Sequence, residues 1–160
     1  ILGTTLTVAG QNLSGLAEGE LTATLTVTDD AGNDNSFTAD SVKDTAAPTT
    51  TVTIDAISED TGTAGDFITS DNDGLTISAT LDAPLAEGET LQYSSDGTTW
   101  IDIPEGSVTG TAVSYDSGLT ESATVQFRVQ DAAGNNGDTV SQAIVIDATS
   151  PSADDNSIAF

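Results

Sequence analysis

The sequence predicts an all-β fold, from its residue types and from the period of its apolar residues. Thr occurs 27 times and Ser 16 times, and 19 Asp stand against 7 Glu. Thr and Val favour strands, whereas Asp and Gly favour the turns between strands. Hydrophobic residues make up 36% of the chain and recur in short alternating runs, and no amphipathic run of helical period stands out. A disordered acidic chain would hold few aliphatic residues, so we expect a folded chain of short strands.

The first predicted elements form a strand pair that ends in a linker. Residues 21–27 alternate apolar residues with Thr, which is typical of a half-buried strand. Residues 29–34 have the composition of a turn, and residues 36–43 predict a weaker strand. Residues 45–48 are expected to be a linker, because Pro48 ends strand pairing and favours extended backbone before it.

The remaining predicted strands follow one another closely after the linker. They are residues 51–57, 75–81, 89–95, 98–103, 108–115, 123–129 and 139–146. A long acidic connection, residues 58–74, separates the first two of them. About seven short strands in a segment of this length are typical of an immunoglobulin-like β-sandwich.

Two parts of the chain share the same motifs at a spacing of about 103 residues. Val-Thr-Asp-Asp-Ala-Gly-Asn at 27–33 is matched by Val-Gln-Asp-Ala-Ala-Gly-Asn at 129–135, and residues 44–48 are matched by residues 147–151. A period of this length indicates a tandem repeat of whole domains.

The repeat predicts the domain organisation. We expect residues 49–147 to form one complete repeat, residues 1–44 to be the last strands of a preceding repeat, and residues 45–48 to link them. Residues 148–160 are expected to be a linker and the start of the next repeat. A piece of about 44 residues cannot bury a sandwich core alone, so we expect the sequence to be cut from a longer array.

The charge balance excludes several classes of function. Two basic residues stand against 26 acidic ones, the formal net charge is −24, and the chain has no Cys and no His. This excludes a basic nucleic-acid footprint and adsorption to an anionic membrane, and no apolar run is long enough to span a bilayer. Cys or Ser-His nucleophiles and ordinary zinc sites are also excluded. Acidic pairs could hydrolyse glycosides, but no aromatic-lined sugar platform accompanies them, so we expect no enzyme.

Several motifs, taken in order, carry a resemblance to a known family. They are residues 129–135, the strand end Asp-Ala-Thr-Ser-Pro at 147–151, the acidic loop at 60–72 and the hairpin Tyr-Ser-Ser-Asp-Gly-Thr-Thr-Trp at 93–100. Together they resemble the bacterial immunoglobulin-like repeats of giant surface adhesins. The resemblance covers nearly all of residues 49–147 and recurs in residues 15–48.

The resemblance implies an extender module of a calcium-dependent adhesin, exported by a Gram-negative bacterium to the cell surface. In that family the repeats bind calcium at and near domain junctions, and the array holds a ligand-binding tip away from the cell. The partners of such a module are the neighbouring repeats of its own chain. One departure is that residues 153–157 do not match residues 49–53, which indicates a next module of another subtype.

The acidic residues support calcium independently of the resemblance. Calcium takes six to eight oxygen ligands, and a charge of −24 is costly to compact without counter-ions. Asp71-Asn72-Asp73-Gly74 superficially resembles an EF-hand start, but it lacks the distal Glu and the flanking helices. The candidate calcium ligands are Glu18, Asp44, Glu59, Asp60, Asp66, the carbonyl of Ile68, Asp71, Asp73, Glu121, Asp131, Asn135 and Asp147.

Sandwich topology predicts how these candidates divide between two sites. Loops of an immunoglobulin-like sandwich cluster at its two ends. Asp131 and Asn135, in the turn before the last strand, should lie where the linker enters, and should approach Asp44 and Glu18.

The other predicted site lies where the chain leaves the sandwich. Asp147 should leave beside the 58–73 loop and Glu121, and should approach Asp60 and Asp66. We therefore expect Asp131 and Asp147 to belong to different calcium sites, a full sandwich length apart.

The function that we expect is a structural extender that calcium stiffens, because unneutralised junction carboxylates repel and let the linker flex. The alternative is a ligand-binding module for sugar or a host protein at the adhesive tip. A tip module should present an exposed aromatic residue or a concave patch away from the junctions. We expect Trp100, Tyr93 and Phe127 to pack in the core instead, and Phe67 to anchor the acidic loop to the sandwich.

Overall fold

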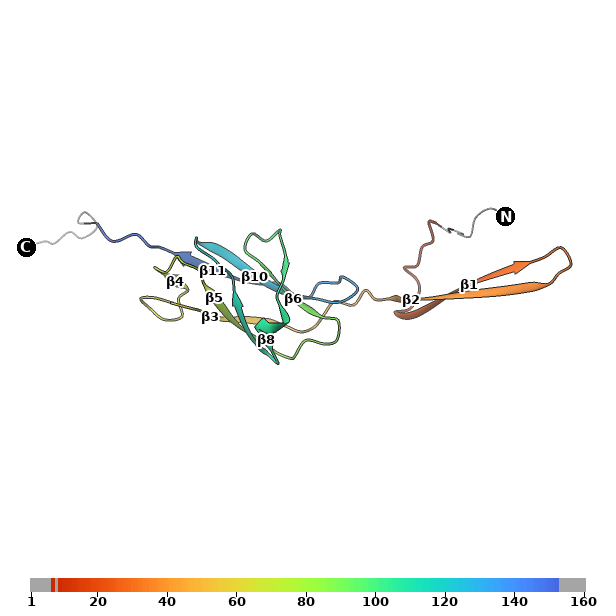
Figure 1. The fold of residues 1–160 in the computed structure, drawn as a ribbon, viewed down its shortest axis with the longest axis horizontal. Coiled ribbons are helices and arrows are strands. Elements are labelled where there is room, and N and C mark those ends of the chain that lie inside the picture. Colours follow the sequence, from red (N-terminus) through yellow and green to blue (C-terminus); the bar gives the residue numbers. More distant parts are fainter. Residues whose placement is uncertain (1–6, 8, 153–160) are drawn as a thin grey trace, which may run out of the picture. The chain divides into compact units, whose positions relative to one another are not determined.

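The computed structural model describes residues 7 and 9–152, and the expected start of a further repeat at 153–160 lies outside these residues (Figure 1). The chain divides into two compact units, residues 1–45 and residues 46–160, here called the N-terminal and the C-terminal unit. The described part consists of strands, loops and one 3₁₀ turn, which confirms the all-β prediction. It contains no helix long and apolar enough to span a bilayer.

The N-terminal unit is a long antiparallel hairpin of β1 (Gly19–Thr28) and β2 (Asp34–Lys43). The strands pair without a bulge from Gly19 opposite Lys43 to Thr28 opposite Asp34. One face carries the alternating Thr residues, and Thr22 donates a hydrogen bond to Asp40 across the pair, at 2.8 Å. The other face is mostly apolar, with Leu25 opposite Phe37 at its centre and the polar Ser41 and Asn35 opposite Leu21 and Val27. Both predicted strands of this segment are confirmed.

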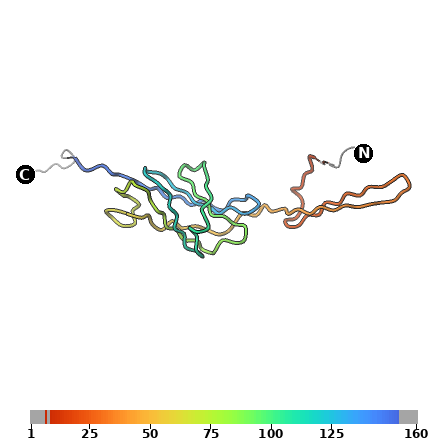
Figure 2. The backbone as a smooth tube through the Cα atoms, in the orientation of Figure 1, coloured from red at the N-terminus to blue at the C-terminus, as the bar shows by residue number. Residues whose placement is uncertain are grey.

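The C-terminal unit is a sandwich of two sheets, as the sequence predicts. One sheet has the order β4-β11-β10-β6-β7, and the other has the order β3-β5-β9-β8. The strands are β3 (Val52–Ile57), β4 (Ile68–Thr69), β5 (Thr76–Leu81), β6 (Thr90–Ser94), β7 (Ile101–Asp102), β8 (Val108–Thr109), β9 (Ala112–Asp116), β10 (Ala123–Gln130) and β11 (Val140–Ile146). The chain path of the unit runs repeatedly between its two ends (Figure 2).

The core lies between these sheets and is built from alternate residues of each strand. Val125, Phe127 and Val129 of β10 are fully buried, and Ile77 and Leu81 of β5 are also fully or nearly fully buried. The ring of Tyr93 lies 5.4 Å from that of Phe127 and 4.9 Å from that of Tyr115, between ring centroids. Burial of these side chains is the main stabilising term for a sandwich without disulfides.

Three predicted elements differ from the structure. The strand expected at 108–115 is two short strands, because the chain turns at Gly110, where φ is +61°. The strand expected at 98–103 is only Ile101–Asp102, since the backbone N–H groups of Thr98 and Thr99 bind the Asp96 carboxylate in a turn. The short strand β4 lies inside the segment predicted as an acidic connection.

The prediction that Trp100 packs in the core is wrong. Asp102 pairs with Gln92, next to the inward-facing Tyr93, so alternation turns Trp100 and Asp102 to the outer face of the sheet. There the guanidinium carbon of Arg128 lies 3.9 Å from the centroid of the Trp100 ring. The Arg128 Nε also donates to the side chain of Gln92. Trp100 therefore covers the one arginine of the chain in a cation–π contact.

Candidate functional site

The motif Asp-x-Ala-Gly-Asn builds the same turn in both units. In the N-terminal unit, one oxygen of Asp29 accepts the backbone N–H groups of Ala31 and Asn33, each at 2.9 Å. The other oxygen accepts the side-chain amide of Asn33, at 2.9 Å. These bonds, with the Asn33 side chain first among them, lower the pKa of Asp29.

Asp131 repeats this arrangement in the C-terminal unit. It accepts the backbone N–H groups of Ala133 and Asn135 at 2.9 and 2.8 Å, and the Asn135 side-chain amide at 2.8 Å. The pKa of Asp131 is lowered for the same reason, chiefly by the Asn135 side chain. The motif thus holds an ionised carboxylate in a fixed orientation. Much of the hydrogen-bond acceptor capacity of this carboxylate is used by groups of its own turn.

The end of the C-terminal unit at this turn is also where the chain enters it, and we call it the proximal end. Gly88, before β6, packs so closely that a Cβ there would lie 3.1 Å from the Cβ of Ala132. A Cβ on Gly137 would lie 2.9 Å from the carbonyl oxygen of Pro48. The turn of Asp131, the loop before β6 and the start of the unit therefore share one end, as the predicted topology requires.

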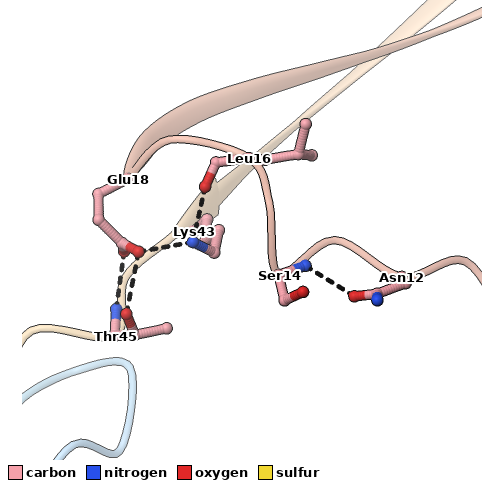
Figure 3. Close-up of polar contacts among 6 residues, drawn as sticks. All are labelled: Asn12, Ser14, Leu16, Glu18, Lys43 and Thr45. Atoms are coloured by element: carbon pink, nitrogen blue, oxygen red, sulfur yellow. Dashed lines mark hydrogen bonds and ion pairs between the residues drawn. The ribbon is translucent and has the colours of Figure 1, made fainter.

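Glu18 and Asp44 lie in the N-terminal unit, so their predicted approach to Asp131 and Asn135 joins the two units and stays a prediction. Within its own unit Glu18 is well bound (Figure 3). It pairs with Lys43 at 2.6 Å and accepts the N–H and hydroxyl of Thr45 at 2.8 and 2.9 Å. Lys43 and Thr45 lower the pKa of Glu18. These contacts close the base of the hairpin, where β2 ends just before Asp44.

The opposite end of the C-terminal unit, which we call the distal end, holds Asp147 beside the acidic loop. β4 pairs in parallel with β11, and the N–H of Asp147 donates to the Thr69 carbonyl at 2.8 Å. Glu121 precedes β10 at this end, where its neighbour Ser122 bonds to Ile146. Because β10 and β11 are antiparallel, Asp131 and Asp147 follow strand ends on opposite sides of the sandwich. The predicted separation of these two residues agrees with the structure.

The acidic loop, residues 58–73, is folded against the sandwich and carries strain. Its Phe67 packs against the core, as expected. Glu59 and Phe67 have φ values of +53° and +60°, which side-chain-bearing residues rarely adopt. The N–H of Gly65 donates to one oxygen of Asp60 at 2.7 Å, and the other oxygen of Asp60 is buried without a hydrogen-bond partner. Such an unsatisfied carboxylate oxygen is costly.

The remaining acidic residues of the loop divide between two places. Glu59, Asp71 and Asp73 line an open hollow of about 300 Å³, together with Thr61 and Ser70. The pKa of Asp73 is raised, first by its side-chain contact with Asp71 and then by the charge of Asp71.

Asp66 takes a different role in the same loop. It accepts the N–H of Ile68 at 2.9 Å in a local turn, and it does not line the hollow. No three carboxylates in the described part of the chain are close enough to hold a metal ion as they stand.

Hydroxyl groups in this loop were not among the predicted ligands. The Thr61 and Ser70 hydroxyls lie 3.3 Å apart at the hollow, and the Thr69 hydroxyl donates to the carbonyl of Glu59. Thr69 is almost fully buried. With 27 Thr in the chain, composition alone gives no signal that separates these from the Thr residues of strand faces.

The comparison with known families agrees with the fold. The family model for bacterial Ig-like domains matches two segments, residues 11–45 and 75–148. No curated protein matches the chain. Domains of this family are commonly parts of extracellular or surface proteins and are typically non-catalytic. The match covers more than half of the sequence and both segments that carry the Asp-x-Ala-Gly-Asn turn, and the chain therefore belongs to the bacterial Ig-like domain family.

Proposed function

We propose that this chain is a structural extender of a surface adhesin, made of repeats in series and stiffened by calcium. The observation that carries the proposal is the position of the chain ends of the C-terminal unit. The chain enters at the proximal end, beside Gly137, and leaves at the distal end after Asp147. Modules joined in this way extend an array, because each one adds its full length.

The loop at the distal end supports a cation there. Asp60 has a buried oxygen without a partner, and Asp71 raises the pKa of Asp73. The chain has only two basic residues, and both are engaged elsewhere, Lys43 with Glu18 and Arg128 with Trp100. No basic side chain is left to neutralise this loop.

The loop residues that would hold calcium are Asp60, Asp66 and Asp71, with Asp73 and the Ile68 carbonyl beside them. Oxygen donors of this kind fit a hard cation of flexible coordination. Bound calcium would supply the positive charge that lets these carboxylates come together. Glu59 and Asp147 flank the same loop and are further candidates, as is Glu121 at the same end.

The proximal end is the proposed junction site. Asp131 and Asn135 would meet Asp44 and Glu18 of the preceding unit across a shared ion. Asp131 is already held by its own turn, so it would bring an oriented charge to the junction. The extender then acts as a stiff rod with calcium and as a flexible chain without it.

The alternative, a ligand-binding tip module, has less support. One hollow of about 490 Å³ has no aromatic ring in its lining, which combines aliphatic residues such as Leu85, Leu91, Ile103 and Val108 with Glu87, Glu89 and Glu105. It lies beside the loop before β6, at the proximal end of the unit. Trp100 is on the outer face but is stacked under Arg128.

Calorimetric titration of the full chain with calcium tests the proposal. We expect saturable binding, and the double variant Asp66→Ala with Asp71→Ala should lose one bound ion. A charge-matched control is Asp55→Asn with Asp102→Asn, two exposed residues on the outer faces of the sheets, which should keep the stoichiometry. Equal stoichiometry in the loop variant and the parent would refute the loop assignment, and absence of binding in the parent would refute the calcium mechanism.

A further inference from the structure

The outer face of β6, β7 and β10 differs in charge from the chain as a whole. Strands β6, β7 and β10 together contain one acidic residue, Asp102, although the chain has 26. The residues of β10 that alternate with its buried ones, and so face outward, are all neutral or basic: Thr124, Gln126, Arg128 and Gln130. The one arginine of the chain therefore lies on a face that is nearly free of carboxylates.

Arg128 is held in place on this face by neutral groups. Its guanidinium carbon lies 3.9 Å from the centroid of the Trp100 ring, and its Nε donates to the Gln92 side-chain oxygen at 2.9 Å. Gln92 is 7% exposed and is itself fixed, because its amide nitrogen donates to Asp102 at 2.8 Å and to Gln130 at 3.2 Å. The guanidinium is thus positioned in advance, which lowers the entropy cost of binding a ligand.

The charged end of Arg128 keeps unused hydrogen-bond capacity. A guanidinium has five N–H donors, and among the described residues only the Nε donor of Arg128 has a side-chain partner. The single ion pair in the described part of the chain joins Lys43 to Glu18, so Arg128 pairs with no carboxylate there. Two terminal guanidinium nitrogens form the fork that binds a carboxylate through two parallel hydrogen bonds.

We propose that Arg128 and Trp100 form a binding site for a saccharide that carries one carboxylate, such as a uronic or a sialic acid. The carboxylate takes the guanidinium fork. C–H groups of the sugar ring pack on the partly exposed indole, because the face of an aromatic ring is electron-rich. The partly exposed amide of Gln126 lies on the same outer face and suits a sugar hydroxyl.

The charge of the chain limits the ligand to a single negative charge. With a net charge of −24, the protein repels polyanions such as nucleic acids and polyphosphates. One carboxylate on a neutral sugar ring meets much less repulsion, and the ring supplies the flat apolar surface that an acidic peptide segment lacks. The inference goes beyond the extender function, since it uses neither the acidic loop nor the chain ends, and it does not require a tip module.

Fluorescence titration tests the proposal, because Trp100 is the only Trp of the chain and reports on this site directly. The full chain is titrated with N-acetylneuraminic acid and with glucuronic acid at constant ionic strength. Glucose, which lacks the carboxylate, and acetate, which lacks the ring, are the matched controls. We expect a saturable change with an acidic sugar and binding about tenfold weaker or less with either control. The response should be the same in calcium and in chelator.

A variant of the arginine separates the fork from its charge. Arg128→Lys keeps the positive charge but removes the paired nitrogens, so we expect the acidic sugar to bind about tenfold more weakly or not at all. Asp55→Asn, on the outer face of the other sheet, is the control and should bind as the parent does. Circular dichroism shows whether each variant is folded, and the comparison of ligands on the parent chain does not depend on any variant.

Four outcomes would overturn the proposal. One is the absence of a saturable response to both acidic sugars, and another is an equal response to acetate, which would mean contact with any anion. The third is full binding by a folded Arg128→Lys variant. The fourth is a peptide of Glu and Gly that binds more tightly than the sugars, which would make the partner an acidic protein segment. Calcium titration of the parent chain remains a separate test of the proposed function.

Discussion

The two ends of the sandwich hold their carboxylates in different ways. At the proximal end, Asp131 accepts three hydrogen bonds from its own turn, and its pKa is lowered. At the distal end, Asp60 keeps a buried oxygen without a partner, and the pKa of Asp73 is raised by Asp71. At the proximal end, hydrogen bonds within the chain satisfy the carboxylate. At the distal end, no basic side chain among the described residues neutralises the carboxylates. The proximal turn should therefore keep its conformation without added ions, whereas the conformation of the distal loop should depend on them.

The largest effect expected from this contrast is the response to calcium. A ligand that binds only the folded state stabilises it by about 2.7 kcal/mol at a hundredfold excess over its dissociation constant. We expect millimolar calcium to raise the Tm of the full chain and a chelator to lower it. Magnesium should substitute poorly, because it prefers a smaller octahedral site. Superimposable melting curves with calcium and with chelator would show that the distal loop needs no cation.

Removing the anchor of the distal loop should have the next largest effect. Phe67→Ala deletes a half-buried ring that packs against the core, and we expect a loss of about 2 kcal/mol in the free energy of unfolding. Limited proteolysis should then cut within residues 58–73. Phe67→Leu keeps most of the apolar volume and serves as the control. A loop that resists protease in both variants would mean that other contacts hold it.

The conformation of the proximal turn should depend on its own carboxylate. Asp131→Asn keeps the shape of the side chain but removes its charge and half of its acceptor capacity, so we expect the Tm to fall by a few degrees. The exposed neighbour position Asp138→Asn is a charge-matched control with no expected effect. An unchanged Tm in the Asp131 variant would show that the turn does not depend on this carboxylate.

The smallest expected effect is on how the free energy of unfolding changes with pH under acidic conditions. The pKa values of Asp96 and Asp131 are lowered, so the stability that these groups contribute is present above the ordinary Asp pKa of about 3.9 and is lost as pH falls below it. Urea unfolding between pH 5 and 2.5 should show this loss. Asp131→Asn should have a shallower pH slope than the parent, and an unchanged slope would contradict the assignment.

Much of the fold follows from local patterns in the sequence. β10 was predicted because its apolar residues alternate strictly, and its turn because Asp, Gly and Asn favour that geometry at those positions. β4 could not be predicted, since two residues in an acidic loop carry no strand signal, and only pairing with β11 makes them a strand. The outward position of Trp100 depends on the register of β7 against β6, which composition does not reveal.

The candidate site was less predictable than the fold. The sequence placed Asp131 and Asp147 at opposite ends, because strand alternation alone decides this. It could not show that Asp66 closes a local turn while Asp71 lies beside Asp73. The conformation of this loop depends on Phe67 packing against a core assembled from distant strands, and also on left-handed backbone at Glu59 and Phe67 that their residue types do not favour.

The parallel pairing of β4 with β11 also bears on how the module would carry load. Tension applied to the chain before β3 and after β11 would pull β11 along its own axis. Its hydrogen bonds to β4 and the residue before it, from Val145 to the Phe67 carbonyl and from Asp147 to the Thr69 carbonyl, would then be sheared together and not opened one after another. The loop that carries β4 is the one whose acidic residues we propose to be fixed by calcium. An ion in that loop would therefore strengthen the pairing of β11 with β4 against such a pull.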